Sequence, residues 1–152
     1  MSLRLTNAAD YAVRAMIHLA CIPEDGVAMA SDIARIHGIP ASFTAKILRN
    51  LVRAGLLRST RGVKGGFALA RPATQITLLD VVEAIEGPLG LMDCTSEPCA
   101  CVLAEECPAQ PVWANVQTKI AELLRAATLE DLVSSPRRRR GSPFVILPTS
   151  AS

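Results

Sequence analysis

Three short segments with apolar residues at helical spacing fill the first 54 residues and constrain the fold of this chain most strongly. The first segment covers residues 7–21, and a proline- and glycine-containing stretch ends it. Ser31 is expected to cap a second helix that reaches about His37, after which a Gly-Ile-Pro sequence breaks the pattern. A third helix is expected over Ala41–Ala54. Two helices joined by so short a turn predict a helix-turn-helix unit.

The third expected helix has two different sides. At about 100° per residue, one narrow stripe carries the polar residues Ser42, Lys46, Arg49 and Arg53. The opposite side carries the apolar residues Phe43, Ile47, Leu48, Leu51 and Val52. The basic stripe holds no acidic residue, unlike an ordinary solvated face, and this favours a recognition helix that contacts DNA. The candidates for contacts with base edges are Ser42, Thr44, Lys46 and Arg49, and Arg53 is a candidate for a phosphate contact.

A glycine-rich turn follows the third helix. It lies between two strand-like runs, Leu56–Thr60 and Phe67–Ala70, and carries Arg61 and Lys64 near its tip. Glycines permit the backbone conformations of a tight hairpin, so we expect a β-hairpin wing whose two basic residues contact phosphates. A nucleotide-binding loop is the alternative, but no helix follows the turn and no Lys-Ser/Thr pair closes it. The predicted fold is mainly α with a small β-hairpin wing.

Charge is segregated along the chain, although the net charge is only +2. Residues 1–75 hold ten Lys/Arg and four Asp/Glu, whereas residues 76–135 hold two and ten. No acidic residue occurs between Asp32 and Asp80. Such a local basic excess predicts a polyanionic partner, here double-stranded DNA, and a merely solvated basic face is the alternative.

The second half of the chain begins with a helix and continues with a cysteine-rich stretch. Thr77 and Asp80 have the spacing of a capping box for a helix that ends near Gly87. An aperiodic stretch then runs to Pro111 and carries four of the five cysteines. Loops longer than about 15 residues are uncommon in compact domains unless something holds them, so we expect the cysteines to hold this one.

A long amphipathic helix is expected after the cysteines, followed by a short helix over Thr128–Val133. Its apolar stripe consists of Val112, Val116, Ile120, Leu123, Leu124 and Ala127. Because the winged helix fills its own core, this stripe is expected to pack against a second copy in a homodimer. The chain thus divides into a winged helix-turn-helix domain (1–75), a cysteine loop with a dimerisation helix (76–133) and a disordered basic tail (134–152).

The cysteines are odd in number and dense, which argues against a disulfide framework. Cys94, Cys99, Cys101 and Cys107 lie within fourteen residues, whereas Cys21 stands apart and is expected to be a small buried residue. Structural zinc favours Cys-x-x-Cys pairs, which are absent here, while iron-sulfur clusters are bound by thiolates on irregular loops. The four clustered cysteines therefore favour an iron-sulfur cluster, and a zinc site and a thiol switch are the alternatives.

Other functional classes find little support in the sequence. No apolar run approaches the roughly 18 residues that a membrane span needs, and the N-terminus lacks the pattern of a signal peptide. We therefore expect a cytoplasmic protein with no membrane partner. His18 and His37 have no evident nucleophile or paired carboxylate beside them, so an enzyme is not expected.

The chain carries, in order, the sequences Arg4-Leu5-Thr6 and Asp10-Tyr11-Ala12-Val13-Arg14, the wing Thr60–Ala70, the sequence Ala84-Ile85-Glu86-Gly87-Pro88, and the cysteine loop followed by Trp113. Over residues 3 to about 132 this arrangement resembles the IscR/NsrR-type (Rrf2) family of winged-helix transcription repressors. The resemblance implies a homodimer on a palindromic operator, with a recognition helix in the major groove and a wing near the minor groove. It also implies an iron-sulfur cluster of the 2Fe–2S or 4Fe–4S type.

The same resemblance implies a set of cluster ligands. The cysteines that match the family's three ligands are Cys94, Cys101 and Cys107, and Cys99 is an alternative to Cys101. IscR-type members use a histidine three residues after the last cysteine, and that position here is Gln110. In NsrR-type members the fourth ligand resembles a carboxylate from the first helix of the other subunit, and Asp10 matches it.

The ligand pattern is therefore closest to that of the NsrR-type nitric-oxide-sensing repressors. The function implied is a dimeric, sequence-specific repressor whose DNA affinity depends on a cluster that senses nitric oxide, redox stress or iron-sulfur status. The alternative is a zinc-stapled or cluster-free thiol-based regulator.

Overall fold

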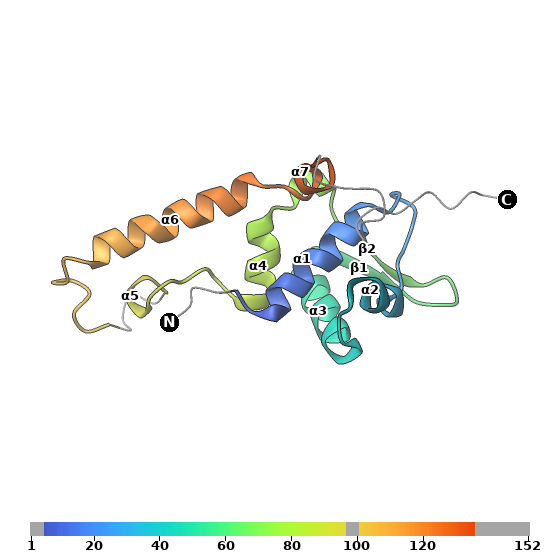
Figure 1. Ribbon diagram of the computed structural model, residues 1–152, viewed down its shortest axis with the longest axis horizontal. Coiled ribbons are helices and arrows are strands. Elements are labelled where there is room, and N and C mark those ends of the chain that lie inside the picture. Colours follow the sequence, from blue (N-terminus) through green and yellow to red (C-terminus); the bar gives the residue numbers. More distant parts are fainter. Residues whose placement is uncertain (1–4, 97–100, 136–152) are drawn as a thin grey trace.

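The computed structural model describes residues 5–96 and 101–135 of the chain. Figure 1 shows the elements in the order α1 (Asn7–Ala20), α2 (Ala30–His37), α3 (Ala41–Arg53), β1 (Leu57–Thr60), β2 (Gly66–Leu69), the 3-10 helix η1 (Ala73–Gln75), α4 (Leu78–Glu86), α5 (Asp93–Ser96), α6 (Gln110–Ala126) and α7 (Leu129–Val133). The mainly helical fold with one small hairpin is the predicted fold class. The tail beyond residue 135 lies outside the described residues.

The first two helices begin differently. Thr6 caps α1, and its hydroxyl oxygen accepts a hydrogen bond from the Ala9 backbone N–H at 3.3 Å. The expected cap at Ser31 is wrong, because α2 already begins at Ala30 and Met29 occupies the cap position without a side-chain hydrogen bond. Gly38 then ends α2 with a φ of +62°, a conformation that favours glycine.

One aliphatic core holds the helices together. Residues from α1, α2, α3 and the wing contribute to it, and so do residues of α4 and α7; its largest fully buried side chains are Met16, Ile33, Leu48, Leu51, Leu56, Ile76, Leu129, Val81 and Val82. The core therefore includes residues on both sides of the domain boundary expected at residue 75, and the cysteine loop is attached to the winged helix through a packed helix.

The wing is an antiparallel hairpin with Leu57 opposite Leu69 and Thr60 opposite Gly66. Ala28 extends it through two backbone hydrogen bonds with Phe67, at 2.8 and 2.9 Å. A Cβ atom at Gly66 would lie 2.7 Å from the Ala28 carbonyl oxygen, so only glycine fits where this segment joins the wing.

Matching capping boxes start α4 and α7. The Thr77 hydroxyl accepts from the Asp80 N–H at 3.1 Å, while the Asp80 carboxylate accepts from the Thr77 N–H at 2.9 Å. Thr128 and Asp131 repeat the arrangement at α7. Because Thr77 and Thr128 also pair as an isolated β-bridge, the chain that leaves α6 returns to the start of α4.

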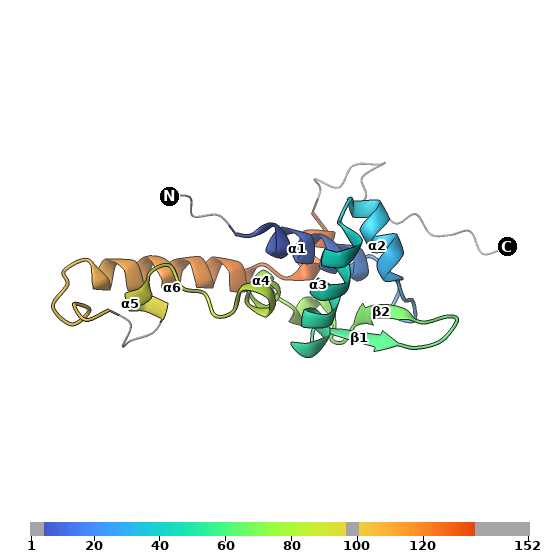
Figure 2. The same ribbon diagram turned by 90° about the horizontal axis from the view of Figure 1, so that it is seen from below.

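The long helix α6 extends away from the winged-helix unit, with α5 beside it, in both Figure 1 and Figure 2. It begins two residues before the expected Val112, and Pro111 lies in its first turn, where proline is tolerated. None of its residues is buried. Within the described ranges, no helix is long and apolar enough to cross a membrane.

Candidate DNA-binding face and cysteine loop

The polar stripe of α3 points outward, as the sequence predicts. Its members Ser42, Lys46, Arg49 and Arg53 are exposed. The other side of the helix is anchored by Ile47, Leu48 and Leu51, which are at most 3% exposed. The core therefore fixes the rotation of α3 and leaves its basic stripe accessible to a partner.

Thr44 is buried rather than offered to a base edge, and Phe43 is more exposed than its place on the apolar side predicts. Thr44 is 2% exposed, and its hydroxyl donates to the Pro40 carbonyl oxygen at 3.1 Å, so this side chain is not available to a base edge. Phe43 is 47% exposed and contacts Tyr11 edge to face, with ring centroids 6.2 Å apart. The buried stripe of α3 passes through positions 44, 47, 48 and 51, because these follow helical spacing.

The wing projects from the end of α3 (Figure 2). Arg61 and Lys64 are exposed on its turn, and Val63 between them is fully exposed. Arg58 on β1 has a structural role instead: its guanidinium donates to the Leu69 and Glu24 carbonyl oxygens at 3.4 and 3.3 Å. The two basic residues of the turn are therefore the ones placed to reach a phosphate.

The positive charges of α3 and of the wing turn are not neutralised within the described part of the chain. Its three ion pairs are Asp10–Arg14, Asp32–Arg35 and Lys119–Glu122. None of these involves a basic residue of α3 or of the turn. The surface formed by the basic residues of α3 and of the wing turn can therefore attract a polyanion, and this attraction weakens as salt is added.

The described cysteines of the loop lie at three different places along it. Cys94 is in α5, Cys101 begins a turn, and Cys107 precedes α6; all three are half-buried free thiols. Cys99 falls outside the described residues. Thiols of this number suit an iron-sulfur cluster chemically. Nevertheless, no three His, Cys, Asp or Glu residues in the described ranges are grouped closely enough to hold a metal ion.

An open cavity of about 540 Å³ lies between part of the cysteine loop and α6. Cys94 and Glu105 line it from the loop, and Gln110 and Gln117 line it from the helix. Gln110, which stands where IscR-type members have a histidine, therefore lies on the same cavity as Cys94. The cavity leaves room for a group larger than a water molecule beside the thiol.

Gln117, which no sequence pattern singles out, contacts the loop directly. Its Oε1 atom accepts from the Leu91 N–H at 3.0 Å, and its Nε2 atom donates to the Thr95 carbonyl oxygen at 3.3 Å. The partners lie 26 and 22 residues away in sequence. No local pattern could have identified this residue, since its role depends on how α6 packs against the loop.

Asp10 is exposed on α1, as expected for a residue that a second subunit must reach, and it pairs with Arg14. The start of α1 is also tied to the residue before the cysteine loop. The Thr6 backbone N–H donates to Glu86 Oε1 at 3.3 Å, and the Thr6 hydroxyl donates to the same atom. The position of Asp10 is thus linked to the end of α4 through one side chain.

His18 and His37 form a buried pair between α1 and α2. The His37 Nε2 atom lies 3.0 Å from His18 Nδ1, and the rings meet edge to face. Burial lowers the pKa of His18, although Asp32 opposes the shift. Burial, His18 and Arg14 lower the pKa of His37 to about 4. The pair is uncharged at neutral pH, and its place in the core fits structural histidines.

Known proteins share both the sequence and the fold. Residues 5–135 match the family model of Rrf2, described as an iron-dependent transcriptional regulator. A Mycobacterium tuberculosis protein named "Putative HTH-type transcriptional regulator Rv1287" is 37% identical over 136 residues, covering 86% of this chain and 81% of its own. Protein aau3 of Rhizobium meliloti is 35% identical over 134 residues, with coverage of 88% and 86%.

Two solved structures extend the comparison. CymR, the global cysteine regulator of B. subtilis, superposes with a TM-score of 0.72 at 29% identity, covering 86% of this chain and 96% of its own. IscR of T. potens superposes with a TM-score of 0.67 at 28% identity, covering 88% of each chain. The winged helix with its long α6 is thus a shared architecture, and the chain belongs to the Rrf2 family of transcriptional regulators.

Proposed function

We propose that this regulator is a dimeric repressor that reads a palindromic operator with α3 and the wing. The observation that carries the proposal is the outward basic stripe of α3, which no ion pair in the described ranges neutralises. Ser42, Lys46 and Arg49 contact base edges in the major groove, while Arg53, Arg61 and Lys64 contact phosphates.

The dimer forms through α6. Val112, Val116 and Leu123 are 60%, 37% and 73% exposed, although they belong to one apolar stripe of a 17-residue helix. Because these three side chains find little cover in their own chain, the stripe favours a second copy as partner. Two-fold pairing of α6 would set the distance between the two copies of α3, and half-sites on DNA tolerate little change in it.

Control of DNA binding resides in the cysteine loop. Cys94, Cys101 and Cys107 would hold an iron-sulfur cluster, and Asp10 of the partner subunit would supply the fourth ligand. Support comes from the chemistry of three half-buried thiols, the exposure of Asp10 and the likeness to IscR of T. potens. When bound, a cluster supplies iron that reacts with nitric oxide or oxygen species. The chain's own part is to hold the thiols on a loop that contacts α6.

The signal is nitric oxide, redox stress or iron-sulfur status, and the ligand pattern favours nitric oxide. Gln110 occupies the position of the IscR-type histidine, and a glutamine amide is a poor substitute for an imidazole ligand. Asp10 then matches the carboxylate of the NsrR-type pattern.

A thiol-based regulator without a cluster is the second candidate, and one comparison favours it. CymR, titled a global cysteine regulator, superposes on this chain with a TM-score of 0.72, and S. aureus CymR in its oxidised form does so with 0.71. In this version the cysteines of the loop respond to oxidation directly or bind zinc.

Anaerobic purification tests these versions against one another. The proposal predicts brown protein with visible absorption, an EPR signal on reduction or nitrosylation, and iron and sulfide in stoichiometric amounts. A Cys107→Ala variant should lose them, whereas Cys21→Ala should keep them, because Cys21 directly follows α1 and lies outside the cysteine loop. Colourless protein that contains zinc, or no metal at all, would support the second candidate.

A further inference from the structure

Residues 90–96 fold into a closed turn that carries Cys94. The Thr95 hydroxyl accepts from the Met92 N–H at 3.2 Å and donates to the Met92 carbonyl oxygen at 2.9 Å. Ser96 donates to the same carbonyl from its backbone N–H, at 3.0 Å, and from its hydroxyl, at 2.9 Å. These bonds are made inside the segment, so they fix its shape without help from the rest of the chain.

Gly90 closes the turn from the other end. A Cβ atom at this position would overlap the Ser96 side chain and lie 2.8 Å from its Cβ atom. Such a close approach leaves little room for rearrangement within the segment. The turn that carries Cys94 is therefore expected to move as a unit.

The Gln117 amide binds this unit near both of its ends. One hydrogen bond joins Oε1 to the Leu91 N–H at 3.0 Å, and the other joins Nε2 to the Thr95 carbonyl oxygen at 3.3 Å. A carboxamide is suited to the task because it offers an acceptor and a donor together. Among the described hydrogen bonds of α6 side chains, those of Gln117 are the ones that reach the turn.

The short helix α5, which carries Cys94, also packs beside α6. Cys94 and Gln117 line the same cavity of about 540 Å³, so open space rather than packed side chains lies beside the thiol. The two hydrogen bonds of the Gln117 amide are the polar link through which a displacement of the turn would reach α6.

We propose that Gln117 is the positioning residue that couples the chemical state of the Cys94 turn to α6. This inference rests on the proposed function, in which the loop controls DNA affinity through the dimer helix. Binding or loss of a cluster by the cysteine loop would displace the Cys94 turn. The two hydrogen bonds of the Gln117 amide would transmit this displacement to α6. The spacing of the two copies of α3 changes as a result.

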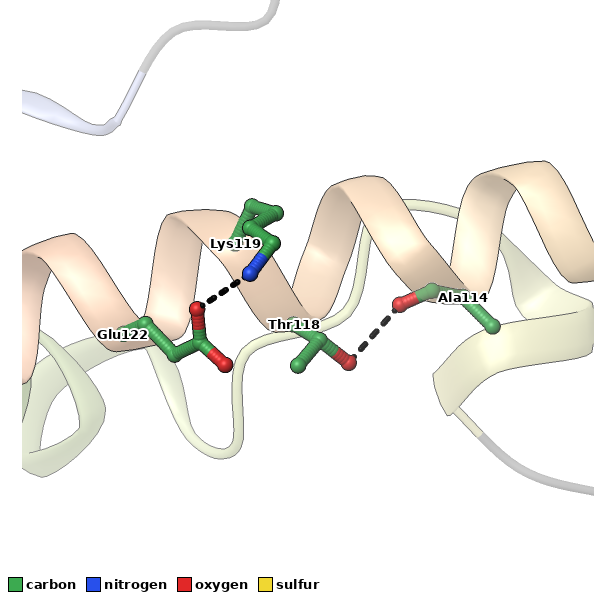
Figure 3. A network of polar contacts seen from close by, with 4 residues as sticks. All are labelled: Ala114, Thr118, Lys119 and Glu122. Carbon is green, nitrogen blue, oxygen red and sulfur yellow. Dashed lines mark hydrogen bonds and ion pairs between the residues drawn. The ribbon is translucent and has the colours of Figure 1, made fainter.

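Three variants of the full-length protein test the coupling. Gln117→Ala removes both hydrogen bonds, while Gln117→Glu keeps an acceptor for Leu91 and loses the donor for Thr95. Thr118→Ala is the matched control, because Figure 3 shows the Thr118 hydroxyl directed at the Ala114 carbonyl oxygen of the same helix, 2.9 Å away. Lys119 and Glu122 also pair within the helix in this view.

The readout is the ratio of DNA dissociation constants between metal-free and cluster-loaded protein, measured on a fragment that the wild type selects from a random pool. Gln117→Ala should reduce this ratio at least fivefold toward one, Gln117→Glu should give an intermediate value, and Thr118→Ala should keep the wild-type ratio. A wild-type ratio in Gln117→Ala, or an equal loss in Thr118→Ala, would overturn the coupling. A ratio of one in the wild type would instead contradict the proposed function.

A second measurement needs no cluster, so it still tests the coupling if a variant fails to bind one. In reduced, metal-free protein, alkylation of Cys94 should be at least threefold faster in Gln117→Ala than in wild type, with Cys21 unchanged as internal reference. Exchange of the Leu91 amide proton should accelerate in the same variant and stay slow in Gln117→Glu. Unchanged rates at both positions would overturn the inference.

Discussion

The Oδ2 atom of Asp10 lies 2.6 Å from the Nη2 atom of Arg14, one helical turn further along the exposed side of α1. Arg14 also lies over the Tyr11 ring, 5.8 Å from its centroid. Exposed pairs of this kind contribute only about 0.3–0.5 kcal/mol to stability. The pair therefore orients the carboxylate on the helix while leaving it accessible to a second subunit.

Replacing Asp10 by alanine should show whether Asp10 is a cluster ligand or only an exposed charge. The free energy of unfolding should change by no more than about 0.5 kcal/mol, because the ion pair is exposed. Loss of a ligand should alter the EPR spectrum of the loaded protein and weaken cluster retention by more than the roughly 10–100-fold typical of an outer-shell change. Arg14→Ala keeps the carboxylate and serves as control. An unaltered EPR spectrum in Asp10→Ala would contradict the role of Asp10 as a cluster ligand.

Lys46 and Thr44 are two residues apart on α3 and should respond in opposite ways. Lys46→Ala should weaken DNA binding by about 1–3 kcal/mol without lowering stability, since Lys46 is exposed. Thr44→Val should cost roughly 1 kcal/mol of stability through the lost bond to Pro40, with unchanged base preference. Thermal unfolding and binding titrations on the same samples measure both. A changed base preference in Thr44→Val would contradict its assignment to the core.

The sequence predicts the elements best where a local pattern decides the structure. The capping box of Thr77 and Asp80 occurs as expected, because its hydrogen bonds join residues only three apart. Ser31 also fits a cap, but α2 begins two residues earlier than a cap at Ser31 would allow, with Met29 at the cap position. At the start of α3, helical spacing places Thr44 on the buried face, but the contact of Phe43 with Tyr11 depends on how α3 packs against α1.

The candidate site is less predictable because its parts come from distant segments. Sequence density identifies the cysteines, yet their arrangement depends on a second subunit and on whatever the loop binds. Gln117 and the His18–His37 pair are invisible in the sequence, since their partners lie 19 to 26 residues away. The outward basic stripe of α3 is predictable because it repeats along one helix.

The His18–His37 pair should make stability fall as the pH is lowered. In the folded chain the pKa values of both histidines lie below the ordinary 6.5, and that of His37 lies at about 4. Below about pH 6.5 the unfolded chain therefore binds more protons than the folded chain. The contribution of the pair to stability is therefore greatest above about pH 6.5 and declines toward pH 4, by at most about 1.4 kcal/mol per pH unit for each histidine.

Urea titrations at several pH values between 7.5 and 4.5 check this dependence. A variant with both histidines replaced by glutamine should show a flatter profile over the same range, whatever its absolute stability. An equally steep profile in that variant would assign the acid sensitivity to other groups.

Leu123 should be needed for the dimer and not for the fold. It is 73% exposed in the single chain and lies on the apolar stripe of α6, so Leu123→Glu should leave the winged helix intact while producing monomer. Sedimentation velocity and far-UV circular dichroism measure the two effects. Leu103→Glu is a matched control, since Leu103 is 63% exposed on the cysteine loop. A Leu123→Glu dimer as stable as wild type would exclude this face of α6 from the interface.

The most direct measurement is an anaerobic binding titration that compares cluster-loaded protein with the same protein after removal of metal under reducing conditions. The DNA is a labelled fragment that the loaded protein selects from a random pool. Control of DNA binding by the cysteine loop predicts at least tenfold tighter binding by the loaded form, equivalent to a coupling free energy of about 1.4 kcal/mol. Equal affinity of the two forms would contradict it.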